Sequence, residues 1–335
     1  MKKLVLVDPN KLQLKGNIHM HTTRSDGKLE PAEAARRYYE AGYQFIMMSD
    51  HEVYWNSTEL DREDFLVLGG TESAILMNDS HRWIIDYRRA ALGNDRTQHK
   101  HMHYCCIKDE SIEDVGQYFA HDEPVPRQLD RGIDSWNKRV ELMRQKGNLV
   151  VVNHPHWSRL DPELLLASQN ITAFEVWNSG DAMHCGGRWD EDIWDYCLTR
   201  GKKLLAVAAD DTHIATTDFA VGFTVVQAEE FTKAAICKGF KSGEFYASCG
   251  PIVREMAIED GVLKMRFTPA RHIQIVGYDR DGFDFCNVDG TLIDQIEWKV
   301  DTTMRYFRVV IIDDHGNRAW CQPVFIEELQ DEGIL

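Results

Sequence analysis

The sequence predicts an α/β protein: a barrel or open sheet of mostly parallel strands, followed by a smaller antiparallel β domain. Up to residue 250, apolar runs typical of buried strands alternate with segments that carry helix-capping signals. Polar residues gather where the apolar runs end, which is where barrel enzymes carry their chemistry. After Gly250 the helical patterns stop, and Asp-Gly and Gly-Asn turns separate short apolar runs. We therefore expect two domains, 1–250 and 251–335.

The expected strands of the first domain are nearly continuous apolar runs, as in parallel strands that are buried on both faces. They are 12–18, 44–51, 65–72, 148–156, 173–178, 203–213 and 221–227. The expected helices are 31–42, 135–147, 189–201 and 229–243. The first begins with Pro31, and all of them end at a glycine, as helices commonly do. The irregular segments 77–102 and 121–132 interrupt this order, and we interpret the first as an insertion over the barrel mouth, a common place for a lid.

The second domain is expected to be a small β-sandwich without helices. Its strands are predicted at 262–267, 272–276, 296–300 and 306–312. The turns between them include Asp260-Gly261 and Gly316-Asn317, which favour antiparallel connections.

Composition restricts the class of protein. The 335 residues are 43% hydrophobic and 27% charged, and no apolar run is long enough for a transmembrane helix. The apolar patch after Met1 is too short for a signal peptide, so we expect a cytoplasmic location. None of the eight cysteines forms a Cys-x-x-Cys pair. The net charge of −16 argues against nucleic acid or an acidic membrane as a partner.

Nine histidine, aspartate and glutamate residues favour a metal centre. His19 and His21 lie two residues apart at a strand end, so both side chains point to one face and can reach one ion. The others stand at the ends of further apolar runs or on the loops beside them: Asp26, His51, Glu72, His103, His154, Asp211 and His213. Each alone could be an ordinary cap, turn or surface residue, but their common placement favours ligands of metal ions.

The donor set also indicates the number and kind of ions. If the Glu72 carboxylate bridges two ions, the nine residues supply ten bonds. Catalytic sites use about three protein ligands per ion and leave a position for water, so ten bonds suit three ions. Nitrogen and oxygen donors without thiolate favour Zn, Mn or Fe.

These motifs resemble the PHP (polymerase and histidinol phosphatase) superfamily over residues 14–250. The resemblance rests on His19-Met20-His21 with Asp26-Gly27, Ser49-Asp50-His51, Glu72, His103, Asn153-His154-Pro155 and Asp211-Thr212-His213. It implies a distorted (β/α)7 TIM-like barrel with two or three divalent metal ions at the carboxyl ends of its strands. It also implies the ligand sets: His19, His21, Glu72 and Asp211 for one ion; Glu72, His103 and His154 for a second; Asp26, His51 and His213 for a third.

Two features of the resemblance are less specific. Segments 243–251 and 319–323 resemble a narrower group, the CehA/McbA-like metallohydrolases, which have a β-rich tail. His103 has competitors in His99 and His101, and we favour His103 because it directly abuts the apolar run, where family members place this ligand. Since His103 heads that run, its strand must run against its neighbours, or the side chain must reach across.

The mechanism expected from such a centre is attack by a metal-bridging hydroxide on phosphorus or on a carbonyl carbon. His156 and Asp50 are candidates to donate a proton to the leaving group, or alternatively to orient a metal ligand. Candidate substrate contacts lie near the ligands: Arg24, Arg159, Arg188, Glu175 and Asn178. The arginines suit phosphate or carboxylate but could be ordinary surface charges. Trp157 and Trp177 could form the wall of a pocket or pack at its rim.

The leading hypothesis is a metal-dependent phosphoesterase that acts on a small phosphorylated molecule. An amide, carbamate or ester hydrolase is the alternative that the narrower resemblance allows. A non-catalytic binding protein with structural metals is an alternative from another class, although a decayed enzyme should have lost some of its ligands. The sequence leaves open whether the C-terminal domain shapes the pocket or forms a homo-oligomer.

Overall fold

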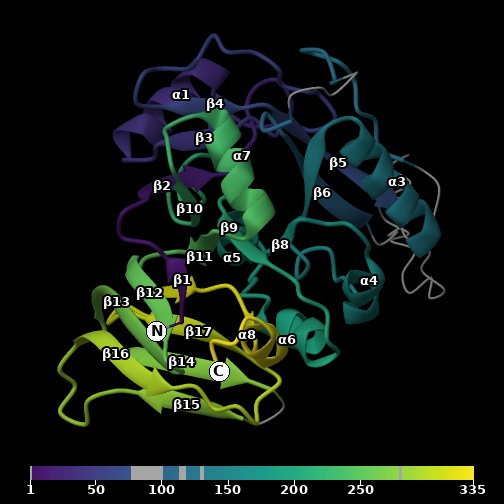
Figure 1. The fold of residues 1–335 in the computed structure, drawn as a ribbon. Coiled ribbons are helices and arrows are strands. Elements are labelled where there is room, and N and C mark those ends of the chain that lie inside the picture. Colours follow the sequence, from purple (N-terminus) through teal and green to yellow (C-terminus); the bar gives the residue numbers. More distant parts are fainter. Residues whose placement is uncertain (1, 77–100, 113–117, 129–131, 279–280) are drawn as a thin grey trace.

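The computed structural model describes residues 2–76, 101–112, 118–128, 132–278 and 281–335 and shows a mixed α/β protein (Figure 1). In Figure 1 most strands and helices before residue 250, purple to green, lie above an antiparallel structure of green and yellow strands, which the purple strand near the N-terminus joins. The insertion expected at 77–102 lies outside the described residues, except for His101 and Met102, which begin a strand. His99 lies outside them as well. No helix in the described ranges is long and apolar enough to cross a membrane.

Helices follow several of the N-terminal strands. They are α1 (Pro31–Glu40), α3 (Ile133–Gln145), α4 (Pro162–Ala167), α5 (Ser179–His184), α6 (Glu191–Thr199) and α7 (Lys233–Ser242). The sequence predicts α1, α3, α6 and α7, with bounds that differ by a few residues, but not the six-residue helices α4 and α5. The Thr232 hydroxyl caps the start of α7, and Gly243 ends it in the left-handed conformation that glycine tolerates. The expectation that no helix follows residue 250 is wrong, because α8 (Ile326–Asp331) forms there and buries Ile326 and Leu329.

A five-stranded sheet carries several of the predicted ligands. In order it contains β5 (Gly70–Leu76), β6 (His101–Lys108), β7 (Asn148–Val152), β8 (Ala173–Asn178) and β9 (Ala206–Ala209). β7, β8 and β9 are parallel, but β6 is antiparallel to both of its neighbours. His103, near the start of β6, therefore lies at the same end of the sheet as residues that follow the parallel strands. This is the first of the two arrangements expected from the sequence.

A ten-stranded sheet contains the remaining N-terminal strands. β2 (Leu12–Asn17), β3 (Phe45–Met47) and β4 (Leu66–Leu68) are parallel, and β10 (Phe223–Ala228) pairs antiparallel with β2. Only Gly69 separates β4 from β5 of the other sheet. On the opposite side, the Thr224 hydroxyl of β10 accepts from the Ala208 N–H at 3.1 Å and donates to the Ala208 carbonyl at 2.9 Å. In the described part of the chain the strand pairings thus form separate sheets, and a side chain instead of a backbone ladder connects β9 to β10.

The C-terminal part is antiparallel, as predicted, and takes strands from both sides of residue 250. One sheet has the order β1 (Lys3–Val7), β12 (Val253–Glu259), β13 (Val262–Ala270) and β16 (Ile293–Lys299). The ten-stranded sheet continues through β11 (Phe245–Ser248) into β18 (Arg318–Trp320), β17 (Tyr306–Ile312), β14 (His272–Gly277) and β15 (Gly282–Phe285), with β19 (Val324–Phe325) beside β17. Two pairings, β1 with β12 and β11 with β18, therefore cross the predicted domain boundary.

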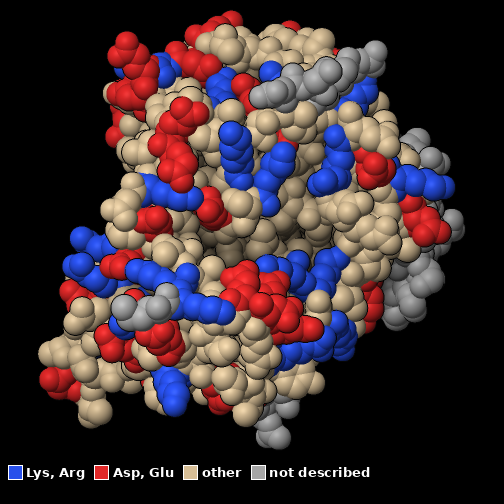
Figure 2. All heavy atoms as spheres, in the orientation of Figure 1, with Lys and Arg blue, Asp and Glu red and all other residues tan. Residues whose placement is uncertain are grey.

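A cavity of about 580 Å³ lies at the amino-terminal ends of β7, β8 and β9, lined by residues that include Leu149, Thr172 and Leu205. Two of its lysines, Lys203 and Lys241, form ion pairs with acidic side chains. Figure 2 shows Lys and Arg side chains gathered around a hollow in the middle of the face that it draws. The lysine charges of the cavity are neutralised, and the predicted ligands lie at the other end of these strands, where we place the functional site.

Arg308 on β17 connects the C-terminal strands to α6. Its side chain is 1% exposed, and its guanidinium donates to Asp195 at 2.6 and 2.8 Å and to Glu191 at 3.1 Å. Glu191 also accepts hydrogen bonds from Arg318 and from the Trp320 indole. A buried guanidinium is tolerated only when it is paired in this way.

Arg308→Ala is expected to lower the free energy of unfolding by about 3–5 kcal/mol, because it removes a buried guanidinium, leaves Asp195 without its ion-pair partner and takes one donor from the buried Glu191. The matched control Lys203→Ala, which removes an exposed ion pair, is expected to cost at most about 1 kcal/mol. Urea unfolding of both variants measures the difference. Equally small losses in the two variants would contradict the structural role of Arg308.

Candidate metal centre

The structure brings all nine predicted ligands together at one end of the sheets. They follow β2, β3, β7 and β9 or lie on β5 and β6: His19, His21, Asp26, His51, Glu72, His103, His154, Asp211 and His213. Eight of them form three overlapping groups whose nitrogen and oxygen atoms lie within 4.8 Å of one another, and His103 adjoins the group that contains Glu72. The sequence motifs therefore converge in space, although they are separated by up to 194 positions between His19 and His213.

The first group consists of His19, His21, Glu72 and Asp211. The Nε2 atoms of the two histidines are 3.2 Å apart, and each lies 3.1–3.3 Å from Glu72 Oε2 and Asp211 Oδ1. Four atoms bound tetrahedrally at about 2.0–2.1 Å from an ion are roughly 3.3 Å from one another. These five distances therefore match a ligand set that closes around one cation.

Glu72 turns its two carboxylate oxygens toward different groups. Oε2 faces the first group and also lies 2.9 Å from His51 Nδ1. Oε1 lies 3.0 Å from His103 Nδ1 and 3.2 Å from His154 Nε2. The carboxylate thus has the placement that a bridge between two ions requires, and His103 and His154 complete a second group.

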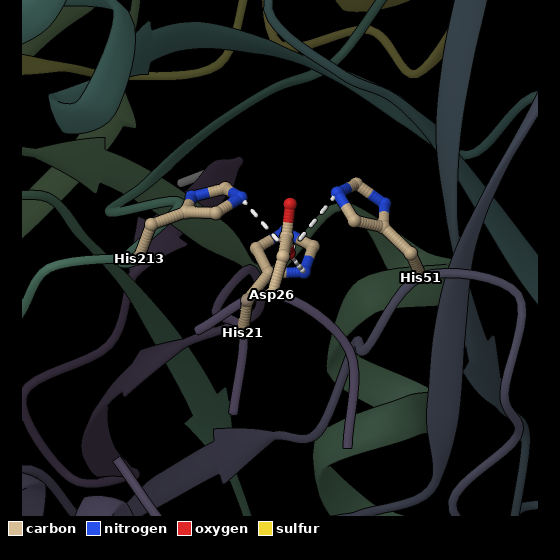
Figure 3. Close-up of side chains that lie close together, drawn as sticks. All are labelled: His21, Asp26, His51 and His213. Atoms are coloured by element: carbon tan, nitrogen blue, oxygen red, sulfur yellow. Dashed lines mark ion pairs between the residues drawn. The ribbon is translucent and has the colours of Figure 1, made fainter. Parts of the chain in front are cut away.

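Asp26, His51 and His213 form a third group, which His21 of the first group adjoins (Figure 3). Asp26 Oδ1 lies 3.5 Å from His51 Nε2, 3.4 Å from His213 Nε2 and 3.9 Å from His21 Nδ1. Figure 3 shows the three imidazoles arranged around this carboxylate. The Asp26 side chain is 58% exposed whereas Glu72 is 1% exposed, so the third group lies nearest to solvent.

Residues of the first group carry buried polar atoms without hydrogen bonds. Among the described residues, Glu72 Oε2, Asp211 Oδ1 and His21 Nδ1 are buried and make no hydrogen bond of acceptable geometry. Leaving such an atom unsatisfied costs about 1–3 kcal/mol, and more for a charged group. Two carboxylate oxygens beside imidazole nitrogens also repel one another unless a proton or a cation lies between them. This donor set therefore fits divalent cations held by nitrogen and oxygen.

Two of the ligands adopt left-handed backbone conformations. Asp211 has φ 53° and His154 has φ 26°, values that cost energy for a residue other than glycine. The Asp211 N–H donates to the His19 carbonyl at 2.8 Å, and the His154 N–H donates to Glu175 Oε2 at 2.8 Å. The backbone of each ligand is thus fixed by a bond to the surrounding site, an arrangement typical of functional sites.

Glu175 and Asn178, expected as substrate contacts, lie behind the ligands. Glu175 is 1% exposed; its Oε1 accepts from His19 Nδ1 at 2.7 Å, and its Oε2 accepts from Asn178 at 2.8 Å. His19 therefore presents Nε2 to the first group. The Asn178 amide also lies 3.2 Å from Asp211 Oδ2. This geometry favours a role in orienting ligands over the expected contact with substrate.

Asn153 and Asp218 support the centre without a clear signal in the sequence. Asn153 donates to Glu72 Oε1 at 2.8 Å. Asp218 accepts from the N–H groups of His213 and Ile214 at 2.8 and 2.9 Å and so shapes the loop of that ligand. Only the position of Asn153, a polar residue at the end of an apolar run, could have indicated its role.

Asp50 is completely buried under the loop between β2 and α1. Its Oδ1 accepts from the Thr22 N–H at 2.7 Å and from the hydroxyls of Thr22 and Ser25 at 2.9 Å. Arg24 on the same loop lies 3.7 Å from Asp50 and 2.5 Å from Asp122. Both side chains hold the loop in place. This geometry favours a structural role for Asp50 over proton donation, and for Arg24 over substrate binding.

The loop after β7 carries His156 and Arg159 beside the second group. His156 Nδ1 lies 2.9 Å from Asp181 Oδ2, and Arg159 Nη1 lies 3.0 Å from His156 Nε2. Burial raises the pKa of Asp181, although the nearby His156 opposes this shift. The His156 side chain is 34% exposed, so this pair combines a buried carboxyl with an accessible imidazole. Arg188 is exposed on the loop between α5 and α6.

Carboxylates raise the pKa of several ligand histidines in the metal-free protein. Burial alone would lower the pKa of His213, but its hydrogen bond to Asp26 and the charge of Asp211 outweigh burial and raise that pKa to about 9. Burial likewise opposes protonation of His19, yet Asp211, Glu175 and Glu72 hold its pKa well above the usual range.

The metal-free protein is therefore expected to lose stability as the pH rises from 6.5 to about 9. Protonated His213 stabilises the folded state fully below its ordinary pKa of 6.5, and this contribution is lost as the pH passes the folded-state pKa of about 9. Metal ions bind neutral imidazole, so the loaded protein should not show this loss. Differential scanning fluorimetry should find that the Tm difference between loaded and metal-free protein grows over this range. A Tm difference that stays constant over this range would contradict the raised pKa of His213. So would metal-free Asp26→Asn with the same dependence of Tm on pH as the metal-free wild type.

Comparison with known proteins gives one match in sequence and several in structure. No family model matches the chain. The DNA polymerase/3'-5' exonuclease PolX of Bacillus subtilis (strain 168) is 26% identical over 184 residues, which cover 49% of this chain and 29% of PolX. The chain thus spans less than a third of this curated relative.

The structural matches include one protein that is described as PHP-like. A two-domain protein from Bacteroides vulgatus, described as containing a predicted PHP-like metal-dependent phosphoesterase, is 15% identical with a TM-score of 0.48, covering 97% of this chain and 98% of that one. A candidate metal-dependent phosphoesterase from Bifidobacterium adolescentis is 16% identical with a TM-score of 0.37, covering 59% and 87%. An amidohydrolase from Chromobacterium violaceum is 15% identical with a TM-score of 0.37, covering 61% and 89%. Similarities of this size decide nothing about activity, and the CehA/McbA-like resemblance stays a prediction.

Proposed function

We propose that this chain is a PHP-type metal-dependent phosphoesterase that hydrolyses a small phosphorylated molecule. The observation that carries the proposal is the first group, in which both histidine Nε2 atoms lie 3.1–3.3 Å from Glu72 Oε2 and Asp211 Oδ1, joined through Glu72 to a second group. We further propose that the N-terminal strands correspond to a distorted (β/α)7 barrel. Residues 1–250 would then form the barrel domain of the protein, and residues 251–335 its second domain.

The residues that would hold the ions follow from the three groups. One ion would be held by His19, His21, Glu72 and Asp211, a second by Glu72, His103 and His154, and a third by Asp26, His51 and His213. When bound, divalent cations lower the pKa of water and neutralise negative charge that develops in the transition state. The nitrogen and oxygen donors suit Zn, Mn or Fe.

Charge favours a phosphate ester over a neutral amide or carbamate. The nine ligands include three carboxylates, Asp26, Glu72 and Asp211. Three divalent cations would bring six positive charges against these three carboxylates and the adjacent buried Glu175, an excess that would attract an anionic substrate. Arg159 adds a positive charge on the loop after β7.

Within the chain, His156 is the candidate to hold the proton that the leaving group needs. Asp181 contacts its Nδ1 and fixes the ring orientation, and the side chain is 34% exposed. Arg159 Nη1 lies 3.0 Å from Nε2, so Arg159 must turn away before that nitrogen can hold the proton. Glu175 fixes the His19 tautomer, and Asp50 holds the loop that carries Asp26. Mutating His156, Glu175 and Asp50 one at a time would test each of these three proposed roles separately.

The experiment that tests the function is a panel of phosphate monoesters and matched carboxyl esters and amides, assayed with Mn, Zn or Fe. Hydrolysis of the phosphate esters, lost in His19→Ala, is the expected result. Turnover of carboxyl esters or amides alone would replace the phosphoesterase by the amide, carbamate or ester alternative. Turnover that His19→Ala leaves unchanged would contradict catalysis at this centre and favour a binding protein.

A further inference from the structure

Trp157 presents an aromatic surface directly beside the second group of ligands. The centroid of its ring lies 5.2 Å from that of His103 and 5.0 Å from that of His154, and the rings meet edge to face. Its residue surface is nevertheless 46% exposed. Large aromatic side chains are usually mostly buried. An exposed indole in contact with His103 and His154 therefore indicates a functional role.

The loop holds Trp157 in a fixed position. Ser158 N–H donates to the His154 carbonyl at 3.1 Å, and Leu160 N–H donates to the Pro155 carbonyl at 2.9 Å. Leu160 is 8% exposed and anchors the end of this turn in the core. The indole is therefore presented by a closed turn, so little conformational entropy would be lost when a ligand contacts it.

The neighbouring loops expose apolar side chains as well. Met183 on α5, which follows β8, is 48% exposed, and Ile214, which comes after β9, is 49% exposed. A contact of 3.6 Å between His184 and Asp218 brings α5 to the loop of Ile214. The end of the protein that gathers the metal-ligand residues therefore also exposes apolar surface.

We propose that Trp157 gives the site a preference for phosphate monoesters of aromatic or other planar apolar alcohols. The inference rests on the proposed phosphoesterase function and names its substrate class. The anionic phosphate would lie at the ligand groups, and the apolar part would lie against the exposed indole, where ring contacts are favourable. In this hydrolysis the oxygen of water forms a bond to phosphorus, the bond between phosphorus and the aryl oxygen breaks, and a proton completes the released alcohol.

The test compares 1-naphthyl phosphate with glycerol phosphate in the wild-type protein, Trp157→Ala and Trp157→Phe. Trp157→Ala is expected to lower kcat/KM for the naphthyl ester roughly tenfold relative to that for the glycerol ester, mainly through KM. Trp157→Phe should retain most of the preference. Both substrates depend on the same metal-binding residues. Any disorder of His103 or His154 therefore affects both kcat/KM values alike and cancels in their ratio. Phe283→Ala removes an exposed aromatic ring on β15, at 52% exposure, and serves as the matched control.

Binding provides a readout that does not depend on turnover. Calorimetric titration of metal-loaded protein should give a Kd for 1-naphthylphosphonate that rises roughly tenfold in Trp157→Ala, with little change for methylphosphonate. An unchanged aryl-to-alkyl ratio in Trp157→Ala, in both kinetics and binding, would overturn the inference. If no phosphate ester is hydrolysed but the aryl phosphonate preference depends on Trp157, the proposed function fails while the aryl-binding surface stands.

Discussion

Glu72→Gln is expected to lower kcat/KM by about 10³-fold or more and to remove metal from the first and second groups. The substitution preserves shape but replaces one carboxylate oxygen by an amide nitrogen, which cannot bind a cation. Glu72 is 1% exposed, and its two oxygens face His19 and His21 on one side and His103 and His154 on the other. Burial alone would raise its pKa, but the charges of the surrounding histidines hold that pKa well below the usual range, so the carboxylate is ionised. Metal content by elemental analysis and kcat/KM on an aryl phosphate measure the two effects.

Glu175→Gln is the matched control for this prediction. Glu175 is equally buried but contacts the centre only through His19 and the His154 backbone. Removing an outer partner of this kind is expected to lower metal affinity by about 10–100-fold, with activity recovered at higher metal concentration. Equal losses in both variants, or full metal content in Glu72→Gln, would contradict the bridging role of Glu72.

Removal of metal by exhaustive chelation is expected to abolish activity and to lower Tm by on the order of 10 °C. Without cations, the oxygens Glu72 Oε2 and Asp211 Oδ1 are both buried beside His19 and His21, and neither makes a hydrogen bond. Cations that bind the folded state alone stabilise it by about 4 kcal/mol per site at a concentration a thousand times the Kd. Thermal unfolding before and after chelation, with parallel assays, measures both effects.

Re-addition of ions distinguishes loss of metal from damage to the protein. Mn, Zn or Fe should restore activity and Tm together, whereas Mg should be less effective because imidazole donors suit transition metals better. A chelated protein that keeps its activity, or whose Tm does not change, would contradict a metal-dependent centre.

The ligand residues could be predicted because the sequence shows both their type and their place. His19 and His21 stand two positions apart at a strand end, and His51, His154 and Asp211 each follow an apolar run. Strand direction converts this pattern into proximity, since the carboxyl ends of parallel strands meet at one edge. His103 also lies in the cluster because β6 runs against its neighbours, which is one of the two arrangements that the position of His103 at the head of its run allowed.

The supporting residues could not be predicted, because their roles depend on contacts between distant parts of the chain. Asp181 meets His156 across 25 positions, and Asn153 meets Glu72 across 81. Glu175 looked like a residue at an open strand end, yet its carboxylate is enclosed by the histidines that it orients. The pairing of β1 with β12 is of the same kind, since nothing local in residues 3–7 indicates a partner near residue 256. The helix α8 was missed because its six residues are too short for a clear helical period.

Anomalous scattering from crystals of the purified protein, measured at the Mn, Fe and Zn edges, tests the central claim most directly. The account predicts one peak among His19, His21, Glu72 and Asp211 and a second among Glu72, His103 and His154, with a third expected beside Asp26, His51 and His213. Crystals grown with these metals that show no anomalous peak near Glu72 would contradict it.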